Sequence, residues 1–493
     1  MKINRLSKQN FQKLIILGLL FVLVGCASVG PDYKVPEIEM HSDWQTVSDP
    51  AMLPRAELVQ KWWTLFNDPV LNRYIEEASL NNFDLLTAIA RVEETRARLG
   101  VATGGRLPSV DVSASVLRGM TSENNFGTGA ADTFYSNGIG ASWEIDLFGR
   151  IRRSVEAATA QYQASEEDRT DVMISLYSSV SLTYLEIRTS QARLGAAKSN
   201  IESRKDLLDL TKSRLEHGLA TELDLARAKS LLSSAEASVP PLRLAVSRGI
   251  NNLAVLLGKR PGTLHEELLN SKPIPLPPLK VTIGVPADLL RQRPDIRKAE
   301  RILAAQTARI GVEKSALYPS FSLTGSFGFE SIDAGDLFDA GSRVFSFGPS
   351  LRWNIFSGGK IRNLVKAQDA VTRQSLFAYE QTVLNGLREV ENNLKAYVED
   401  RIRLAALERS VKAARHSVLL ATDLYTQGLV NFQPVLDARR DQFNYENQMA
   451  AAKGDSAANF VRLYASLGGG WDPNHSRTPV ITDKKSKPET KNQ

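Results

Sequence analysis

The sequence predicts an α+β membrane protein that contains two copies of one unit, each with two strands and a long helical hairpin. Three observations support this fold class. The 493-residue chain begins with an export signal that ends at its only cysteine. Two large segments superimpose when the sequence is shifted by 210 or 211 residues. In each segment, alternating stretches of about ten residues precede a proline-free helical region of 67 residues.

Residues 1–25 have the pattern of a lipoprotein signal peptide. The apolar run 14–24 would rise only about 16 Å as a helix, too little for a bilayer core of about 30 Å. Four cations and no acid precede it, namely Lys2, Arg5, Lys8 and Lys13. Removing these cations lowers the formal charge from +6 to +2, so the mature chain has no basic excess suited to nucleic acid.

Cys26 is the expected lipidation site. It ends the sequence Leu23-Val24-Gly25-Cys26, which resembles the lipobox of bacterial lipoproteins, where the cysteine is alkylated and becomes the first mature residue. Several acyl chains on one residue give stable membrane anchoring. Ala27, in place of aspartate, favours the outer membrane as the destination. The alternative is an ordinary signal peptide with a free or buried thiol at Cys26.

An internal duplication organises most of the chain. Landmarks recur in the same order in both copies: Trp143, Gly149 and Gly218 correspond to Trp353, Gly359 and Gly428. Prolines concentrate between the copies, which predicts an extended connector there. The predicted boundaries are an acylated segment at 26–69, a first repeat at 70–258, a Pro-rich connector at 259–286, a second repeat at 287–468 and a flexible tail at 469–493.

Two strands are predicted in each repeat, at about 108–118 and 134–147 and at about 319–330 and 343–356. One face of each strand is apolar, and the other carries Ser, Thr, Gly, Asn and a few charged residues. The apolar faces consist of Val110, Val112, Ala114, Val116, Ile139, Ala141, Trp143, Ile145, Leu147, Phe321, Leu323, Phe327, Phe329, Phe345, Phe347, Leu351, Trp353 and Ile355.

Long helical hairpins are predicted at 150–258 and 359–468. Each starts with a helix of 67 residues, which would be about 100 Å long. A turn at Gly218 or Gly428 follows, and one returning helix then runs to Gly258 or Gly468. Hairpins of this length resemble coiled coils.

Four strands cannot close a barrel, and an open sheet edge in lipid leaves backbone groups unpaired, so several chains must contribute. Two chains would supply about eight strands around a filled interior, and three would supply about twelve around a pore. The polar, glycine-rich strand face favours the pore. The alternative is a soluble domain with two packed sheets.

The chain resembles the TolC-like outer-membrane factors of efflux pumps, and among them the acylated OprM-type lipoproteins. The resemblance covers roughly residues 26–470. Its most specific segment is Pro286-Ala287-Asp288-Leu289-Leu290 followed by Arg293-Pro294-Asp295-Ile296 and Ala299-Glu300. The other matching segments are Gly30-Pro31-Asp32-Tyr33, Trp62-Trp63 with Phe66 and Asp68-Pro69, and Asp146-Leu147-Phe148-Gly149-Arg150.

The resemblance implies a homotrimer with a 12-stranded outer-membrane β-barrel, four strands per chain, continued by a 12-helix periplasmic α-barrel. It implies a passive conduit that exports drugs, toxic compounds or metal ions. A periplasmic adaptor and an inner-membrane pump, expected to be of the RND type, would deliver the substrate. The alternative functions are an exit duct of a type I-like secretion system for a protein or envelope component, and a passive envelope spacer.

The hairpin turns are the expected gate, because they lie farthest from the strands. By likeness to TolC, Asp224, Tyr425 and Asp437 occupy the positions of gate contacts and of the aperture acid, and three carboxylates at Asp437 would favour cations. Val430 and Pro434 depart from the charged latch of that pattern. An apolar closure by Leu429, Val430 and Phe432 is therefore an alternative, and Asp224 and Asp437 are alternatively acids that complement a helix dipole.

The Gly-Leu pair at each turn is the expected adaptor-docking site, and simple turn chemistry is its alternative. These pairs are Gly218-Leu219 and Gly428-Leu429.

No catalytic, metal or cofactor site is expected apart from the lipid on Cys26. His217 and His416 have no convincing partner in the sequence for a catalytic triad or a metal site. A single cysteine excludes an internal disulfide framework and multi-cysteine metal sites. Gly358-Gly359-Lys360 lacks the spacing of a phosphate-binding loop, and its counterpart Gly149-Arg150 favours a joint between strand and helix.

Overall fold

The computed structural model describes residues 28–41, 43–45, 52–54, 60–120, 122, 124, 129–278 and 280–471. Cys26 and the tail beyond Trp471 lie outside these residues. The chain divides into two compact units. Unit 1 is drawn from Met1–Ile38, Ile89–Asp168 and Asp295–Thr382, and unit 2 from Glu39–Ala88, Arg169–Pro294 and Val383–Gln493. Each unit therefore takes segments from both predicted repeats.

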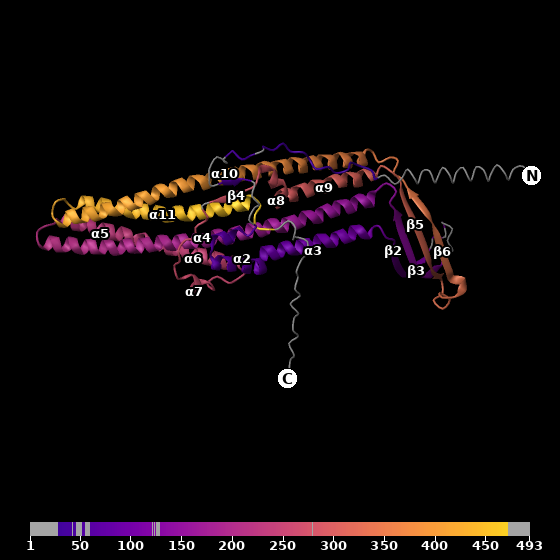
Figure 1. The fold of residues 1–493 in the computed structure, drawn as a ribbon. Helices are drawn as coiled ribbons and strands as arrows, with labels where there is room; N and C mark the ends of the chain where they lie inside the picture. The colour runs from indigo at the N-terminus through magenta and orange to yellow at the C-terminus, as the bar shows by residue number, and fades with distance from the viewer. Residues whose placement is uncertain are drawn as a thin grey trace, which may run out of the picture. The chain divides into compact units, whose positions relative to one another are not determined.

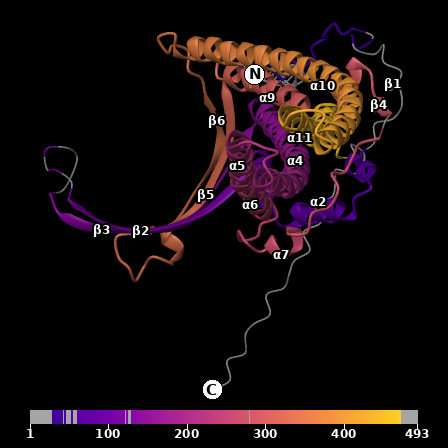
Figure 2. The ribbon, with the colours of Figure 1, turned by 90° about the vertical axis from the view of Figure 1, so that its left-hand side faces the viewer.

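Unit 1 contains an antiparallel sheet of four strands in the order β2-β3-β5-β6, which Figure 2 shows as one curved ribbon. The first repeat supplies β2 (Ser109–Met120) and β3 (Ala131–Ile145), and the second supplies β5 (Ser320–Ser331) and β6 (Arg343–Arg352). The two hairpins join through β3 and β5, so β2 and β6 are the edges of the sheet. The predicted α+β organisation, with one sheet built from the four predicted strands, is confirmed.

The register of the sheet separates apolar from polar side chains by rows. Residues paired across all four strands share one face, because side chains alternate along each strand. One such row is apolar, Val112–Ile139–Phe327–Phe345, and all four side chains are exposed in the single chain. The neighbouring row on the opposite face is polar or small, Asp111–Gly140–Ser326–Ser346.

A tryptophan braces each joint between helix and strand in the same way. The indole nitrogen of Trp143 donates to the carbonyl oxygen of Arg106 at 3.0 Å, and that of Trp353 donates to Leu317 at 3.1 Å. Trp353 and Ile355 fall outside β6, which ends at Arg352, whereas the sequence predicts strand to about residue 356. The two acceptors, Arg106 and Leu317, each lie two residues before a proline, Pro108 or Pro319. They also lie two residues beyond the end of a helix, α3 (Phe83–Gly104) or α9 (Pro294–Ser315).

The long helices are α4 (Arg150–Glu216) and α10 (Lys360–Thr426), each of 67 residues. In the second repeat the returning helix is continuous as α11 (Gln433–Ser466). In the first repeat it is broken at Ser238 into α5 (Glu222–Ala237) and α6 (Val239–Leu256), unlike the single helix predicted there. The cause is Pro240-Pro241, since proline lacks the N–H that a helix interior needs and fits only in a first turn.

Shorter elements complete unit 2. They are β1 (Met52–Pro54), paired in parallel with β4 (Val281–Ile283), the 3-10 helices η1 (Trp62–Phe66) and η2 (Pro286–Asp288), and the helices α2 (Pro69–Asn81), α7 (His265–Leu268) and α8 (Leu289–Gln292). The predicted connector thus includes a helix turn and a short strand. A 3-10 turn, η3 (Ala340–Ser342), precedes β6 in unit 1.

The aromatic residues at 62–66 belong to the core of unit 2. Trp63 packs edge-on against Tyr177, with ring centres 5.0 Å apart, and Phe66 does so against Phe460 at 5.2 Å. Asp68 caps α2 by accepting from the backbone nitrogen of Val70 at 2.8 Å. Among the helices that the structure describes, none has both the length and the apolar composition needed to cross a membrane.

Candidate functional site

The two hairpin turns lie in unit 2 and share one backbone geometry. Gly218 ends α4 with φ +70°, and Gly428 ends α10 with φ +76°. The next residue bonds back in each case: Leu219 N–H donates to Arg214 at 2.7 Å, and Leu429 N–H donates to Leu424 at 2.9 Å. This is the glycine-terminated Schellman motif. Glycine is favoured by the positive φ and not by crowding, since a Cβ at either position would meet no atom within 4 Å.

Figure 1 shows α5 beside α4 and α11 beside α10 in this part of the molecule. Side chains link each pair: Arg204 Nη1 donates to the Leu231 carbonyl at 2.6 Å, and Arg415 Nε pairs with Glu446 at 2.8 Å. Between the two hairpins lies an apolar cluster, which we call the tip core. It consists of Leu207, Ala228, Tyr425, Phe432, Val435 and Leu436.

Tyr425 and Phe432, two of the predicted gate residues, are buried in the tip core. Their rings lie 5.3 Å apart, and Val430 packs against the same cluster as a half-buried side chain. The Phe432 ring is therefore already packed against residues of its own chain. The sequence could not show this, because Leu207 of α4 and Ala228 of α5 lie more than 200 positions before Phe432 in the chain.

Arg214 covers the Tyr425 ring. Its guanidinium carbon lies 4.5 Å from the ring centre, within the range of a cation–π contact, and its Nη1 approaches the Thr426 carbonyl at 3.4 Å. The Tyr425 hydroxyl is buried beside Arg214 and Thr211. Burial raises the pKa of Tyr425, and Arg214 opposes part of that rise. Sequence analysis did not identify Arg214, whose only signal was a cation in the last turn of α4.

Asp224 is engaged at the start of α5. Its Oδ2 accepts from the Thr221 backbone nitrogen at 3.1 Å and from the Thr221 hydroxyl at 2.7 Å, while the Asp224 N–H donates to Thr221 Oγ1 at 3.2 Å. This reciprocal arrangement is a capping box, which satisfies backbone donors that the first turn leaves free. Asp224 thus lies in the first turn of α5, the position in which sequence analysis alternatively expected an acid that complements the helix dipole.

Asp437 stands in the second turn of α11 with 43% of its side chain exposed. Its carboxylate pairs with Arg440 Nη2 at 3.1 Å and accepts from Gln433 Nε2 at 3.2 Å. Both partners belong to its own helix. The N-cap of α11 is Phe432, whose side chain makes no capping hydrogen bond. Asp224 therefore takes part in a capping box, whereas Asp437 does not.

The leucines of the two Gly-Leu pairs face solvent. Leu219 is 64% exposed and Leu429 is 67% exposed, unlike the tip core behind them. Isolated exposed leucines are ordinary, but two at equivalent turns form a repeated apolar feature. The structure therefore separates the predicted tip residues into a buried set, Tyr425 and Phe432, and an exposed set, Leu219 and Leu429.

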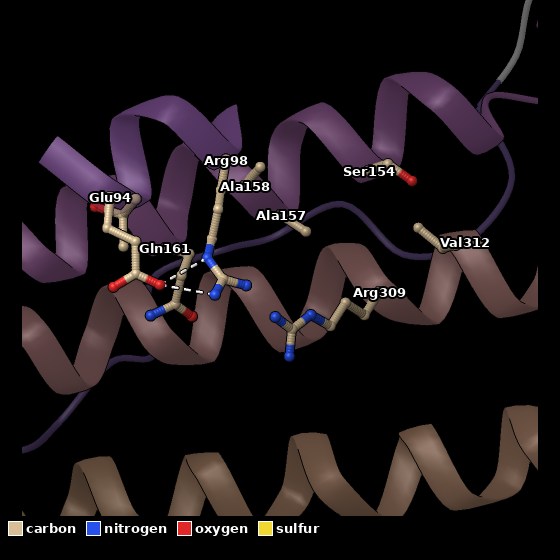
Figure 3. A pocket seen from close by; sticks show the side chains of 9 residues that line it. Glu94, Arg98, Ser154, Ala157, Ala158, Gln161, Arg309 and Val312 are labelled. Atoms are coloured by element: carbon tan, nitrogen blue, oxygen red, sulfur yellow. Dashed lines mark hydrogen bonds and ion pairs between the residues drawn. The ribbon is translucent and has the colours of Figure 1, made fainter. Parts of the chain in front are cut away.

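A pocket of about 550 Å³ lies in unit 1 among α3, α4 and α9 (Figure 3). It contains Arg98, paired with Glu94 at 2.7 Å, together with Gln161 and Arg309. No histidine, cysteine or aspartate lines it. Across the described ranges, no group of three or more His, Cys, Asp or Glu side chains is placed to hold a metal ion.

The sequence profile of a family described as "Outer membrane efflux protein" matches residues 74–259 and 285–469. The toluene efflux pump outer membrane protein TtgI of Pseudomonas putida is 34% identical, with 94% of this chain and 98% of TtgI covered. Nodulation protein T of Rhizobium leguminosarum bv. trifolii is 31% identical, with 92% and 96% covered.

A solved structure of the outer-membrane channel OprN superimposes with a TM-score of 0.86 at 35% identity, with 90% of this chain and all of that chain covered. The family predicted from the sequence is confirmed, and so is its function as an efflux channel of the outer membrane. The chain therefore belongs to the outer membrane efflux protein family, whose members are channels and not enzymes.

Proposed function

We propose that three copies of this chain close into one conduit, with twelve strands in the outer membrane and twelve helical rods in the periplasm. The observation that carries the proposal is the sheet of unit 1. It has one apolar face, one polar face and two edges, β2 and β6, that have no partner within the described chain. In lipid, every unpaired N–H or C=O group along such an edge costs several kcal/mol. The two edges must therefore pair with strands of further chains.

The strand directions support closure between copies. Each neighbour in the order β2-β3-β5-β6 is antiparallel, so β2 and β6 run in opposite directions. Setting β6 of one copy beside β2 of the next continues the antiparallel alternation without a break. Twelve strands leave room for an aqueous interior, whereas eight would be filled by side chains.

The polar row of the sheet would then line the interior and the apolar row would face lipid. The serine hydroxyls of Ser326 and Ser346 bond to each other at 2.8 Å, and those of Ser115 and Ser136 do so at 2.9 Å, which satisfies polar groups without charge. The apolar row through Ile139 and Phe345 suits hydrocarbon.

We further propose that Cys26 carries the lipid anchor and that the exposed Gly-Leu turns receive a periplasmic adaptor, which links the channel to an inner-membrane pump of the RND type. At the gate, the tip core holds the two hairpins of one chain together. Asp437 supplies the acid at the aperture, and Asp224 stabilises the turn before α5 through its capping box. Leu429 and Val430 add apolar contacts at the gate.

The proposed cargo is small and apolar or amphipathic. Relatives carry the names toluene efflux, solvent efflux and antibiotic efflux pump outer membrane protein. The pump would then set the selectivity, so organic solvents and antibiotics are the first compounds to examine.

A deletion strain tests this function. We expect it to accumulate toluene and hydrophobic antibiotics and to regain resistance when the full chain is restored. Native mass spectrometry of the purified protein should give three times the mass of the mature chain. Unchanged susceptibility together with loss of a protein from the culture medium would instead establish the secretion duct.

A further inference from the structure

The apolar face of the sheet in unit 1 carries two charged side chains, and both are arginines. Because side chains alternate along each strand, the register puts Arg118 of β2 and Arg343 of β6 on the same face as Phe345 of the apolar row. Both arginines are exposed in the single chain. The other charged residues of the four strands lie on the opposite face, namely Asp111, Asp132, Glu144, Glu330 and Arg352. The charge on the apolar face is therefore entirely positive.

The two arginines lie at the same end of the sheet. Arg118 lies two residues before the end of β2 at Met120, and Arg343 is the first residue of β6. This end carries the hairpin turns and is opposite the joints to α3, α4, α9 and α10. With the helices in the periplasm, it is the end that meets the outer leaflet of the outer membrane. An arginine is costly at the bilayer midplane and nearly neutral beside the interface, so the position suits these side chains.

Polar and aromatic residues accompany the arginines on this face. Asn137 stands in the same row as Arg343, and Tyr135 lies in the next row toward the hairpin turns. Trp143 lies on the same face near the helices. Aromatic girdles at the two ends of an apolar band are typical of membrane barrels. The band suited to hydrocarbon therefore ends near Tyr135, and the arginines lie where lipid headgroups begin.

The turn between β5 and β6 folds over the same face. The Phe338 ring centre lies 5.7 Å from that of Phe329, which in turn lies 5.8 Å from that of Phe327 in the apolar row. Within the turn, the Ser342 hydroxyl donates to the Asp336 carbonyl at 2.7 Å. Phe338 is nevertheless 72% exposed. The turn therefore presents an exposed aromatic ring on the apolar face of the sheet and not on the polar face.

We propose that these residues form an outer rim, defined by Arg118, Tyr135, Phe338 and Arg343, which binds phosphorylated lipids of the outer leaflet. The arginines contact the lipid phosphates, because a guanidinium group matches phosphate with paired, charge-assisted hydrogen bonds. The aromatic rings lie at the boundary between headgroups and acyl chains, where one side of a ring meets water and the other hydrocarbon. This inference rests on the proposed orientation of the channel, with its helices in the periplasm.

Neighbouring copies complete the outer rim. Arg118 and Arg343 belong to β2 and β6, the two edge strands of the sheet. When β6 of one copy pairs with β2 of the next, the two strands that meet at the seam each bring one cation to the same face. Charge complementarity then favours an anionic lipid, since a headgroup without net charge gains little from two added cations.

The test measures lipid binding to the purified full-length trimer by native mass spectrometry. The probe is lipid A that carries two phosphates, and the comparison lipid is the same lipid A after removal of both phosphates. The variants are Arg118→Ala, Arg343→Ala, the double alanine variant, and a double lysine variant that retains both charges. Arg352→Ala is the matched control, because it also removes a cation from β6, but on the opposite face and at the helix end. Thermal unfolding of each variant separates loss of binding from loss of fold.

We expect the phosphorylated lipid A to bind about fivefold more weakly to each single alanine variant than to wild type, and about 30-fold more weakly to the double alanine variant. The double lysine variant should bind more tightly than the double alanine variant, and Arg352→Ala should match wild type. All variants should unfold at the wild-type temperature. Binding to wild type should weaken as the salt concentration rises, because salt screens exposed charges.

Equal binding of the phosphorylated lipid A to wild type and to the double alanine variant would overturn the inference. Equal binding of the two forms of lipid A to wild type would do the same. Displacement of lipid A by an equal concentration of inorganic phosphate would identify a free-anion site in place of a lipid site. Conductance of the same trimer in planar bilayers keeps the two proposals apart, since a conducting trimer that does not distinguish the two lipids refutes the outer rim alone.

Discussion

Arg214 and Tyr425 join the two helical hairpins of one chain, with the guanidinium carbon 4.5 Å from the centre of the ring. The pair sits where α4 and α10 end, and the Tyr425 side chain is only 3% exposed. A cation–π contact contributes about 0.5–2 kcal/mol, and the half-buried Arg214 lies between the exposed and the desolvated case. Opening the tips by separating the hairpins of a chain would have to break this contact.

Arg214→Ala is therefore expected to raise the open probability of the channel in planar bilayers. Arg227→Ala is the matched control, because Arg227 also links the two hairpins but does so by an exposed contact of 3.4 Å to Gln433. The control should stay near wild type, since exposed polar contacts contribute little. Equal behaviour of the two variants would mean that the stacked pair does not hold the tips.

The two acids of the tips should respond differently to substitution. Asp437→Ala is expected to weaken block by divalent cations, because it removes three carboxylates from the aperture of a trimer. Asp224→Ala should instead destabilise the start of α5 by about 1 kcal/mol through loss of the capping box, with little change in block. Conductance measured with and without Mg²⁺, together with thermal unfolding, distinguishes them. Unaltered divalent block in Asp437→Ala would remove it from the aperture.

The exposed leucines should matter for partner binding and not for stability. The double variant Leu219→Ser and Leu429→Ser is expected to abolish efflux in cells while the purified trimer unfolds at the wild-type temperature. Leu269→Ser is a suitable control, because Leu269 is similarly exposed but lies beside α7, away from the turns. Full antibiotic resistance in the double variant would show that the adaptor docks elsewhere.

Neighbouring residues on β6 provide a test of which sheet face meets lipid. Phe345 belongs to the apolar row and is 79% exposed in the single chain, whereas Ser346 belongs to the polar row. Phe345→Arg should reduce insertion sharply, since arginine facing the bilayer midplane costs about 2–4 kcal/mol. Ser346→Arg should insert normally and alter conductance. The reverse pattern would place the polar row toward lipid.

Sequence patterns were informative wherever the controlling interaction is local. Alternation of side chains located the strands, and glycine at 218 and 428 located the helix ends, because both depend on residues a few positions apart. The break at Ser238 was also readable, from Pro240-Pro241, although the prediction of one returning helix passed over it. Helix ends and strand rows are therefore the parts of such a channel that a sequence reveals best.

Long-range contacts were not readable from the same patterns. Apolar residues at a turn could close a pore or pack within their own chain, and burial of Phe432 depends on Leu207, which is far away in sequence. The same limit applies to Arg153, whose partner Asp32 lies 121 residues earlier. Asp224 shows the opposite case, because its capping box with Thr221 involves residues only three positions apart.

The most direct test of the channel is the conductance of the purified full-length trimer in planar bilayers, recorded for wild type and Arg214→Ala. A conduit with an acidic aperture should give discrete, cation-preferring channel events, and they should be more frequent or larger in Arg214→Ala. Absence of conductance from both proteins, when trypsin protection shows that their strands are inserted, would contradict a channel and identify a passive envelope spacer.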